Sequence, residues 1–226
     1  MSKARPLRGE GTRDALIQAG IEIFGRDGFH AASSRSLAAA AGVNQALIGY
    51  HFGSKHGLYL AVFEHVTAQL ADQLVPVATR VGVEIAAIEH SSGKREARCI
   101  DAMETLMFTM LQLLSQPQTA GWAKLIVREQ QEPTEAFDIL YDGMMGRMLG
   151  VLTRLVALAG ALDERSQEAR LCALTLVGQV LVFRVANAAL QRHLGWHEGI
   201  GSAELNAIRT QLRINLESRF GRRGKS

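Results

Sequence analysis

The sequence contains few of the residues that characterise small secreted proteins or β-rich proteins. Its 226 residues include only two cysteines, four prolines and three tyrosines. The small numbers of proline and tyrosine argue against an all-β protein. Cys99 and Cys172 lie far apart in the chain. One disulfide between them is compatible with the sequence, but reduced thiols in a cytoplasmic protein are the simpler interpretation.

Long apolar stretches are also absent. The first residues, MSKARPLRGEGTRD, contain no apolar run, so we predict no signal peptide. The longest run without a charged residue is Thr105–Ala123, and its three glutamines, one serine and one proline make it a poor membrane span. We therefore expect a cytoplasmic protein that does not enter a membrane.

A large excess of one charge is absent as well, since the formal net charge is only +3. This excludes a histone-like polycation, but the charges are unevenly distributed. Residues 1–60 contain seven lysines and arginines against four acids, residues 61–221 contain fifteen against eighteen, and residues 222–226 add three basic residues. Basic ends on a mildly acidic body suggest two functions in one chain.

Helical periodicity, in contrast, runs through the whole chain. Hydrophobic residues make up 47% of the sequence, enough for a sizeable core. Apolar residues recur at intervals of three and four, and no segment shows sustained strand alternation. We predict an all-α protein of about nine helices. They cover residues 12–27, 34–41, 44–51, 55 to about 80, 96–115, 119–131, 133–159, 164–194 and 202–220.

Residues 34–51 have the composition of a helix-turn-helix. Gly42 suits the left-handed conformation that ends the first of these two short helices. The small residues Ala38, Ala39 and Ala41 allow the two helices to cross closely. Such a pair of helices is a candidate DNA-binding motif.

The second helix of such a pair enters the major groove, where its N-terminal side chains meet base edges. Gln45 is the natural reader, because its amide pairs bidentately with adenine, and Ala46 and Leu47 offer apolar contacts to a thymine methyl group. We predict phosphate contacts from the end of this helix and from two helix N-termini, which we expect Thr12 and Ser34 to cap. The predicted DNA-binding set, with the helix cap Asn44 included, is Thr12, Arg13, Ser34, Arg35, Asn44, Gln45, Ala46, Leu47, Tyr50, His51 and Lys55.

Residues 12–63 contain a further set of residues in a characteristic order and spacing: Phe24, Gly28, Phe29, Ser34, Leu37, Ala38, Ala41, Gly42, Val43, His51, Phe52, Ser54, Lys55 and Leu58. In these residues the segment resembles the DNA-binding domain of the TetR family of transcriptional regulators. The resemblance implies an all-helical homodimer with an N-terminal three-helix DNA-binding domain and a C-terminal ligand-sensing domain. The family's base contacts fall on residues 45–47. Its phosphate contacts fall on Tyr50, His51 and Lys55.

On this interpretation the chain has four parts. They are a basic flexible arm (1–11), a helix-turn-helix DNA-binding domain (12–56), a ligand-binding and dimerisation domain (57–221) and a basic tail (222–226). The arm is suited to lie along phosphates or in a minor groove. A second resemblance is carried within residues 127–160 by the segments 128–133 (REQQEP) and 136–138 (AFD). These residues resemble the C-terminal domain of the CecR/CerR group within the family, which implies control of membrane export or drug-tolerance genes.

The sequence departs from the family pattern at Gly49. The family often has a tyrosine there that can contact DNA, and glycine removes that contact. Glycine also costs about 1 kcal/mol of helix stability relative to alanine. The departure leaves open a second interpretation, a small-molecule-binding or scaffold protein with a vestigial DNA-binding motif.

Pliable apolar side chains gather in the middle of the sequence. Methionine and aromatic side chains adapt to varied apolar ligands, but each of them is also an ordinary core residue. Arg128 and Glu129 are polar residues on an otherwise apolar helix, where they can orient a ligand or form an ion pair at the surface or between helices. The predicted ligand-binding set is Met103, Met107, Phe108, Trp122, Arg128, Phe137, Tyr141, Met144 and Met145.

The last two predicted helices suit self-association. Residues 171–190 are apolar on nearly all sides, so this helix must be covered on two sides, either by its own domain and a partner or within a larger monomer. Paired with the final helix, it predicts a four-helix homodimer interface. The predicted interface residues are Leu174, Gly178, Leu181, Val182, Val185, Ala189, Leu205, Ile208, Leu212 and Leu216.

No residue pattern indicates catalysis, a metal site or a cofactor. His193 and His197 are four residues apart, but Gly195 separates them and no further ligand lies nearby in the sequence. There is no phosphate-binding loop and no nucleophile elbow. We therefore predict no enzyme but a regulator, a repressor released from a palindromic operator by an unidentified small molecule. An activator or a DNA organiser of the same fold is an alternative.

Overall fold

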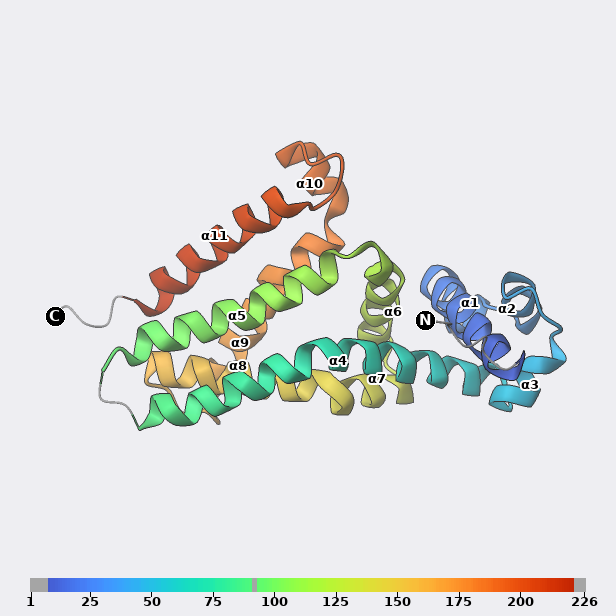
Figure 1. Cartoon of the computed structure of the whole chain (residues 1–226), viewed down its shortest axis with the longest axis horizontal. Coiled ribbons are helices and arrows are strands. Elements are labelled where there is room, and N and C mark those ends of the chain that lie inside the picture. The colour runs from blue at the N-terminus through green and yellow to red at the C-terminus, as the bar shows by residue number, and fades with distance from the viewer. Residues whose placement is uncertain (1–7, 91–92, 222–226) are drawn as a thin grey trace, which may run out of the picture. The chain divides into compact units, whose positions relative to one another are not determined.

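The computed structural model describes residues 8–90 and 93–221, and every regular element among them is helical. The helices form two compact units (Figure 1). The N-terminal unit consists of the described part of Met1–Leu70 together with Ala120–Gly143, and the C-terminal unit of Ala71–Thr119 with the described part of Met144–Ser226. This confirms the predicted all-α fold. The predicted tail at 222–226 lies outside the described residues.

Four helices enclose the core of the N-terminal unit. These are α1 (Arg8–Ala31), α2 (Ser34–Ala40), α3 (Ala46–Phe52) and the first part of α4 (Lys55–Glu89). Apolar side chains at helical spacing point inward, and those with at most 2% exposure include Leu16, Phe24, Leu37, Ile48, Leu58 and Phe63. Burial of these side chains supplies the main free energy that holds the small helices together.

Two further helices complete the N-terminal unit. α6 (Ala120–Gln131) packs along α1, and α7 (Glu135–Leu140) follows it. A Cβ atom at Gly121 would lie 2.8 Å from Ile21 Cγ2, so the close approach of α6 to α1 requires glycine. The unit thus joins the predicted DNA-binding domain to two helices of the predicted ligand-binding domain.

The C-terminal unit is built around α5 (Arg95–Ser115). This helix packs against α8 (Gly146–Gly160), α9 (Gln167–Val185) and α11 (Ser202–Phe220), and Figure 1 shows α11 running alongside it. α10 (Asn187–Leu194) follows α9. The buried face of α5 repeats at intervals of three and four and includes Cys99, Met103, Leu106, Met107 and Leu111.

The N-terminal helix differs from the prediction at its start. α1 begins at Arg8, so residues 8–11 are helical and Thr12 lies inside the helix. Thr12 therefore does not cap it, and the helix N-terminus expected near Thr12 and Arg13 does not lie there. The phosphate contacts of these two residues stay a prediction. The predicted stop at Gly28 is visible as a kink, since Gly28 has φ 81° and ψ 171° within α1. The remainder of the predicted arm, residues 1–7, lies outside the described residues.

Two long predicted helices are irregular. The helix predicted at 133–159 is continuous from Glu135 to Gly160, with α7 and α8 joined by a five-residue π-helical turn at Tyr141–Met145. It begins two residues later than predicted, because Thr134 caps α7 through a hydrogen bond from the Ala136 N–H. The segment 164–194 consists of α9 and α10, which are bent by 78° at Ala186. No glycine or proline lies next to Ala186 to indicate this break.

Some helices are apolar enough to raise the question of a membrane. The stretch Glu135–Gly160 has the length and composition of a membrane span, as has the bent pair α9 and α10 taken together. In α8, the apolar side chains Leu152, Leu155 and Val156 are at most 3% exposed. Packing of α8 against α5 and α9 therefore accounts for its apolar composition.

Candidate nucleic-acid interface

The turn between α2 and α3 has the geometry of a helix-turn-helix. Gly42 adopts φ 66°, the left-handed conformation that the sequence predicts. α2 begins with a capping box in which the Ser33 hydroxyl accepts the Ser36 N–H at 3.0 Å and Ser36 Oγ accepts the Ser33 N–H at 3.1 Å. The cap is therefore Ser33, and not Ser34 as predicted, because the backbone of Ser34 is already helical. Ser34 and Arg35 form the first turn of α2.

α3 presents the predicted reading side chains on its surface. Asn44 fixes the start of the helix, since its Oδ1 atom accepts the Ala46 N–H at 2.9 Å. Ile48 is 2% exposed and anchors the helix to the core, while Gln45 and Ala46 are exposed. Leu47 is half-buried. The helix thus offers an amide and a methyl group to a ligand from outside.

Aromatic and basic side chains lie near the end of α3. Tyr50 is 82% exposed, and its ring meets the edge of the His51 ring with 4.9 Å between the ring centroids. The Arg13 guanidinium lies 5.4 Å from the centroid of the Phe52 ring. Arg13 is therefore held beside α3 by a cation–π contact instead of marking a helix N-terminus. These side chains supply donors suited to phosphates.

Lys55 has an intramolecular role. Its ammonium donates hydrogen bonds of 2.9 Å to the carbonyl oxygens of Phe29 and Ala32 and lies 4.4 Å from the Phe29 ring centroid. The two carbonyls belong to the end of α1 and the turn before α2, so Lys55 ties this turn to the start of α4. One of its three donors stays available for another partner.

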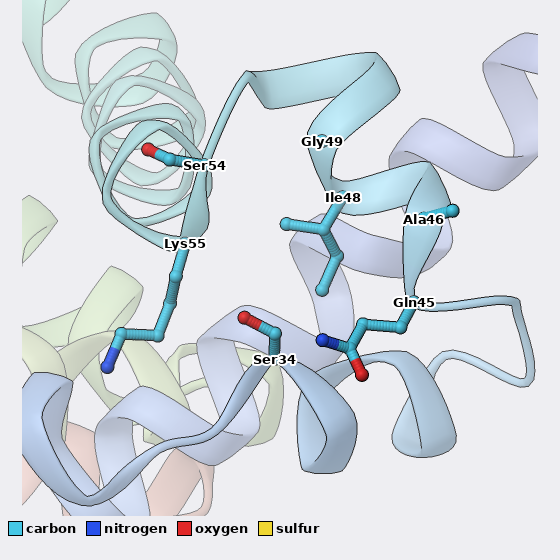
Figure 2. Close-up of a pocket in the computed structure, with 7 residues that line it drawn as sticks. All are labelled: Ser34, Gln45, Ala46, Ile48, Gly49, Ser54 and Lys55. Carbon is cyan, nitrogen blue, oxygen red and sulfur yellow. The ribbon is translucent and has the colours of Figure 1, made fainter.

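A cleft of about 330 Å³ lies among α2, α3 and the start of α4 (Figure 2). It is lined by Ser34, Gln45, Ala46, Ile48, Gly49, Ser54 and Lys55. In Figure 2 the Gln45 side chain extends toward Ser34, and the Lys55 ammonium points away from the cleft. None of the seven lining residues is acidic. The cleft is thus bounded mostly by neutral hydrogen-bonding groups and small apolar ones.

A buried carboxylate connects α4 to the turn between α6 and α7. Glu129 is 1% exposed, and its oxygens accept hydrogen bonds from the Tyr59 hydroxyl at 2.5 Å and from the Thr134 N–H and hydroxyl at 2.5 and 2.7 Å. Burial, followed by the hydrogen bond to Glu129, raises the pKa of Tyr59. The sequence singles out Glu129 as a polar residue on an otherwise apolar helix, but it does not indicate Tyr59 and Thr134 as its partners.

The predicted ligand-binding residues divide between the two units. Trp122, Arg128, Phe137 and Tyr141 belong to the N-terminal unit, whereas Met103, Met107, Phe108, Met144 and Met145 belong to the C-terminal unit. Met103 and Met107 are at most 1% exposed within the packed face of α5. Arg128 donates a hydrogen bond of 3.4 Å to the Arg26 carbonyl. The ligand-binding role of this set stays a prediction.

The described residues contain no group of three or more histidine, cysteine or acidic side chains placed to hold a metal ion. Both cysteines are free thiols, in agreement with the simpler of the two sequence interpretations. Cys99 is buried, and burial raises the pKa of its thiol to about 11. A thiol with such a pKa is a poor nucleophile at neutral pH.

The predicted interface on α9 lies on the surface of the unit. Ala173, Leu176 and Val180 are buried, while the other side of the helix is exposed. The predicted residues on that side are Leu174, Gly178, Val182, Val185 and, in α10, Ala189, with Leu181 half-buried. Leu174, Val182 and Val185 are 54%, 45% and 58% exposed. α9 is therefore apolar on two sides and covered on one.

The predicted interface on α11 is largely wrong. Ile208, Leu212 and Leu216 are at most 3% exposed, because this side of the helix packs against α5. Ion pairs reinforce that packing, with Glu104 accepting from Arg209 at 2.6 Å and from Arg213 at 2.8 Å. Leu205 is half-buried.

The sequence prediction missed Ile214. It is 51% exposed and is the large apolar side chain that α11 presents to solvent. The neighbouring Asn215 donates a hydrogen bond of 2.9 Å to Gln179 of α9, so the two helices lie side by side at this point.

The capped turn, the anchored α3 with its exposed N-terminal side chains and the following helical unit define a helix-turn-helix DNA-binding regulator. Residues 16–62 match the family model of bacterial regulatory proteins of the TetR family. Residues 99–219 match the model of the C-terminal domain of the HTH-type transcriptional dual regulator CecR. The chain therefore belongs to the TetR family of bacterial transcriptional regulators, in the group with the CecR C-terminal domain.

Known relatives agree with this assignment. The HTH-type transcriptional dual regulator CecR of Shigella flexneri is 31% identical over 193 residues, which cover 85% of this chain and 84% of the relative. The structure of FadR from Bacillus subtilis in complex with stearoyl-CoA has a TM-score of 0.56 at 15% identity, covering 90% of this chain and 96% of FadR. AibR in complex with isovaleryl coenzyme A and operator DNA has a TM-score of 0.58 at 14% identity, covering 92% and 98%. These two structures share the fold.

Proposed function

We propose that the protein is a ligand-responsive regulator that binds a palindromic operator as a homodimer and is released by a small molecule. One observation carries the DNA-binding part: Ile48 fixes α3 to the core while Gln45 and Ala46 remain exposed. In this proposal Gln45 reads an adenine edge, and Arg13, Arg35, Tyr50 and His51 contact phosphates. The protein acts in the cytoplasm by binding and not by catalysis.

Homodimerisation is proposed through the exposed stripe of α9. Leu171, Leu174, Gly178, Val182 and Val185 follow one another at intervals of three and four, and four of them are large apolar side chains at 45–58% exposure. A stripe of this kind supports close packing against a second copy of itself. On α11 the proposed interface includes the exposed Ile214 and leaves out the predicted residues Ile208, Leu212 and Leu216, which are buried. A dimer also supplies the two recognition helices that a palindrome needs.

The proposed ligand acts through the helices that carry its predicted contacts. Trp122 of α6 and Phe137 of α7 belong to the same unit as α3, and α6 packs along α1. A ligand that displaces α6 thus acts directly on the DNA-binding helices. It releases DNA only if it binds the DNA-incompetent conformation more tightly. Because FadR and AibR hold acyl-CoAs, such thioesters are the first compounds to screen.

Selection of genomic fragments with the purified protein tests this function. The proposal predicts enrichment of fragments that share a palindrome, with binding that weakens when a compound from the screen is added. Absence of any enriched palindrome would favour a scaffold protein with a vestigial motif. Transcript levels with and without the gene then distinguish repression from activation, and they show whether export or drug-tolerance genes are among the targets.

A further inference from the structure

The recognition helix has a glycine where no intramolecular contact requires one. Gly49 lies in the middle of α3 and is exposed, and its φ is not in the left-handed region. A Cβ atom built on Gly49 meets no atom within 4 Å. Folding of the free protein would therefore tolerate alanine here and gain from it, because glycine weakens a helix interior. Packing within the described residues therefore does not account for glycine at this position.

The space beside Gly49 is part of the cleft among α2, α3 and the start of α4 (Figure 2). Gln45 lies one helical turn before Gly49 on the same face of α3. The group that enters this cleft is thus next to the base that Gln45 reads in the proposed function. Any side chain at position 49 would narrow the cleft on the side of the DNA.

The side chains that line the cleft favour a ligand group with several hydrogen-bond acceptors. Ser34 and Ser54 contribute hydroxyls and Gln45 an amide, and no acidic residue lines the cleft. Ser54 Oγ accepts the Gly57 N–H at 3.0 Å, so its own hydroxyl proton is free to be donated to another group. Hydroxyl and amide donors without a nearby carboxylate fit a phosphodiester group.

We infer that Gly49 determines how closely the operator approaches, because a phosphodiester of one operator strand enters the cleft over its Cα atom. The inference rests on the proposed DNA-binding function and deepens it. It makes the departure at position 49 a requirement for this chain's mode of binding and not a sign of lost function.

The test compares Gly49→Ala with Gly150→Ala. Gly150 is also an exposed glycine inside a helix, and a Cβ atom there also meets nothing within 4 Å. Both variants should raise the thermal midpoint by about 2–4 °C. On an operator fragment selected with the wild-type protein, Gly49→Ala should bind at least about tenfold more weakly at fixed salt, and Gly150→Ala within about twofold of wild type. Unchanged or tighter binding by Gly49→Ala would overturn the inference.

Operators carrying one methylphosphonate at a time identify the group in the cleft. At one position in each half-site the neutral linkage should weaken wild-type binding about fivefold or more and Gly49→Ala binding less than twofold. Equal losses for both proteins at every position would contradict the inference. A thymine-to-uracil substitution that weakens wild-type binding but not Gly49→Ala binding would also contradict the inference, because it would show that a base methyl group occupies the cleft. If the wild-type protein selects no fragment, the proposed function fails and this inference with it. If the wild-type protein selects an operator and Gly49→Ala binds it with the same affinity, the proposed function stands and the inference fails.

Discussion

The Tyr59 hydroxyl donates a hydrogen bond of 2.5 Å to Glu129, a carboxylate that is 1% exposed and 70 residues away in the sequence. Tyr59 lies on α4, the helix that follows the recognition helix α3 in the sequence, and Glu129 lies on α6. The pair joins the DNA-binding helices to the segment that carries two of the proposed ligand contacts, Trp122 and Phe137. We therefore expect this hydrogen bond to contribute to stability and, in the proposed function, to the response of the DNA-binding helices to a ligand.

Removal of the Tyr59 hydroxyl should destabilise the fold. Tyr59→Phe leaves a buried carboxylate oxygen without one of its donors, which costs about 1–3 kcal/mol of unfolding free energy. Urea denaturation followed by circular dichroism measures the loss. Tyr50→Phe is the matched control, since Tyr50 is 82% exposed and its hydroxyl should not affect stability. Equal stability of the two variants would mean that the bond to Glu129 contributes nothing.

Cys99 should make stability decrease at alkaline pH. Burial raises the pKa of the folded thiol from 9.0 to about 11, so between these values the unfolded chain loses a proton that the folded chain keeps. Stability from this group is complete below pH 9 and falls by up to about 1.4 kcal/mol per pH unit toward pH 11. Denaturation curves of wild type and Cys99→Ala across this range measure the effect. The variant should show a shallower decline, and parallel declines would refute the assignment.

Lys55 should contribute to stability and not to the salt dependence of DNA binding. Lys55→Met removes the two hydrogen bonds to the Phe29 and Ala32 carbonyls and should cost about 1–3 kcal/mol of unfolding free energy. The slope of log K against log salt should remain as in wild type. For the exposed Arg35, Arg35→Ala should leave stability unchanged and reduce the slope by about 1.8, the value for one phosphate contact from each subunit of the dimer. The reverse pattern would show that Lys55 contacts DNA directly.

A charge in the exposed stripe of α9 should abolish the dimer. Val182→Glu places a carboxylate at the centre of the proposed interface and should raise the dimer dissociation constant about 100-fold or more. Sedimentation equilibrium measures the change. Val83 of α4 is even more exposed, at 71%, and Val83→Glu should leave the association constant as in wild type. A Val182→Glu protein that remains dimeric would place the interface elsewhere.

The features predicted correctly from the sequence depend on neighbouring residues, whereas the features it missed depend on contacts between distant segments. Local signals sufficed for the helix-turn-helix, because Gly42, Asn44 and the apolar spacing each act within a few residues of their position. The same holds for the helix at 202–220, whose predicted bounds agree with α11. Contacts between distant segments were not accessible in this way. Tyr59 and Glu129 each follow an ordinary helical pattern, and only the fold brings the hydroxyl to the carboxylate.

The errors in α11 have the same origin. Ile208, Leu212 and Leu216 form an apolar stripe that the sequence alone cannot assign to a partner chain or to the chain's own core. The structure assigns this stripe to the chain's own core, where it packs against α5, and the ion pairs of Arg209 and Arg213 with Glu104 reinforce that packing. Lys55 shows the same limit, because its charge indicates a phosphate contact and only the structure shows its hydrogen bonds to the carbonyls of Phe29 and Ala32. Its phosphate contact stays a prediction.

The most direct test of the account is base discrimination by Gln45. The affinities of wild type and Gln45→Ala are measured at one salt concentration by fluorescence anisotropy, for a selected operator and for operators with single base-pair changes. Each half-site should contain one adenine whose replacement in a single half-site costs wild type about 1–3 kcal/mol of binding free energy. Gln45→Ala should bind the selected operator and this changed operator equally. Full discrimination at every base pair by Gln45→Ala would contradict the claim that α3 reads the operator through this side chain.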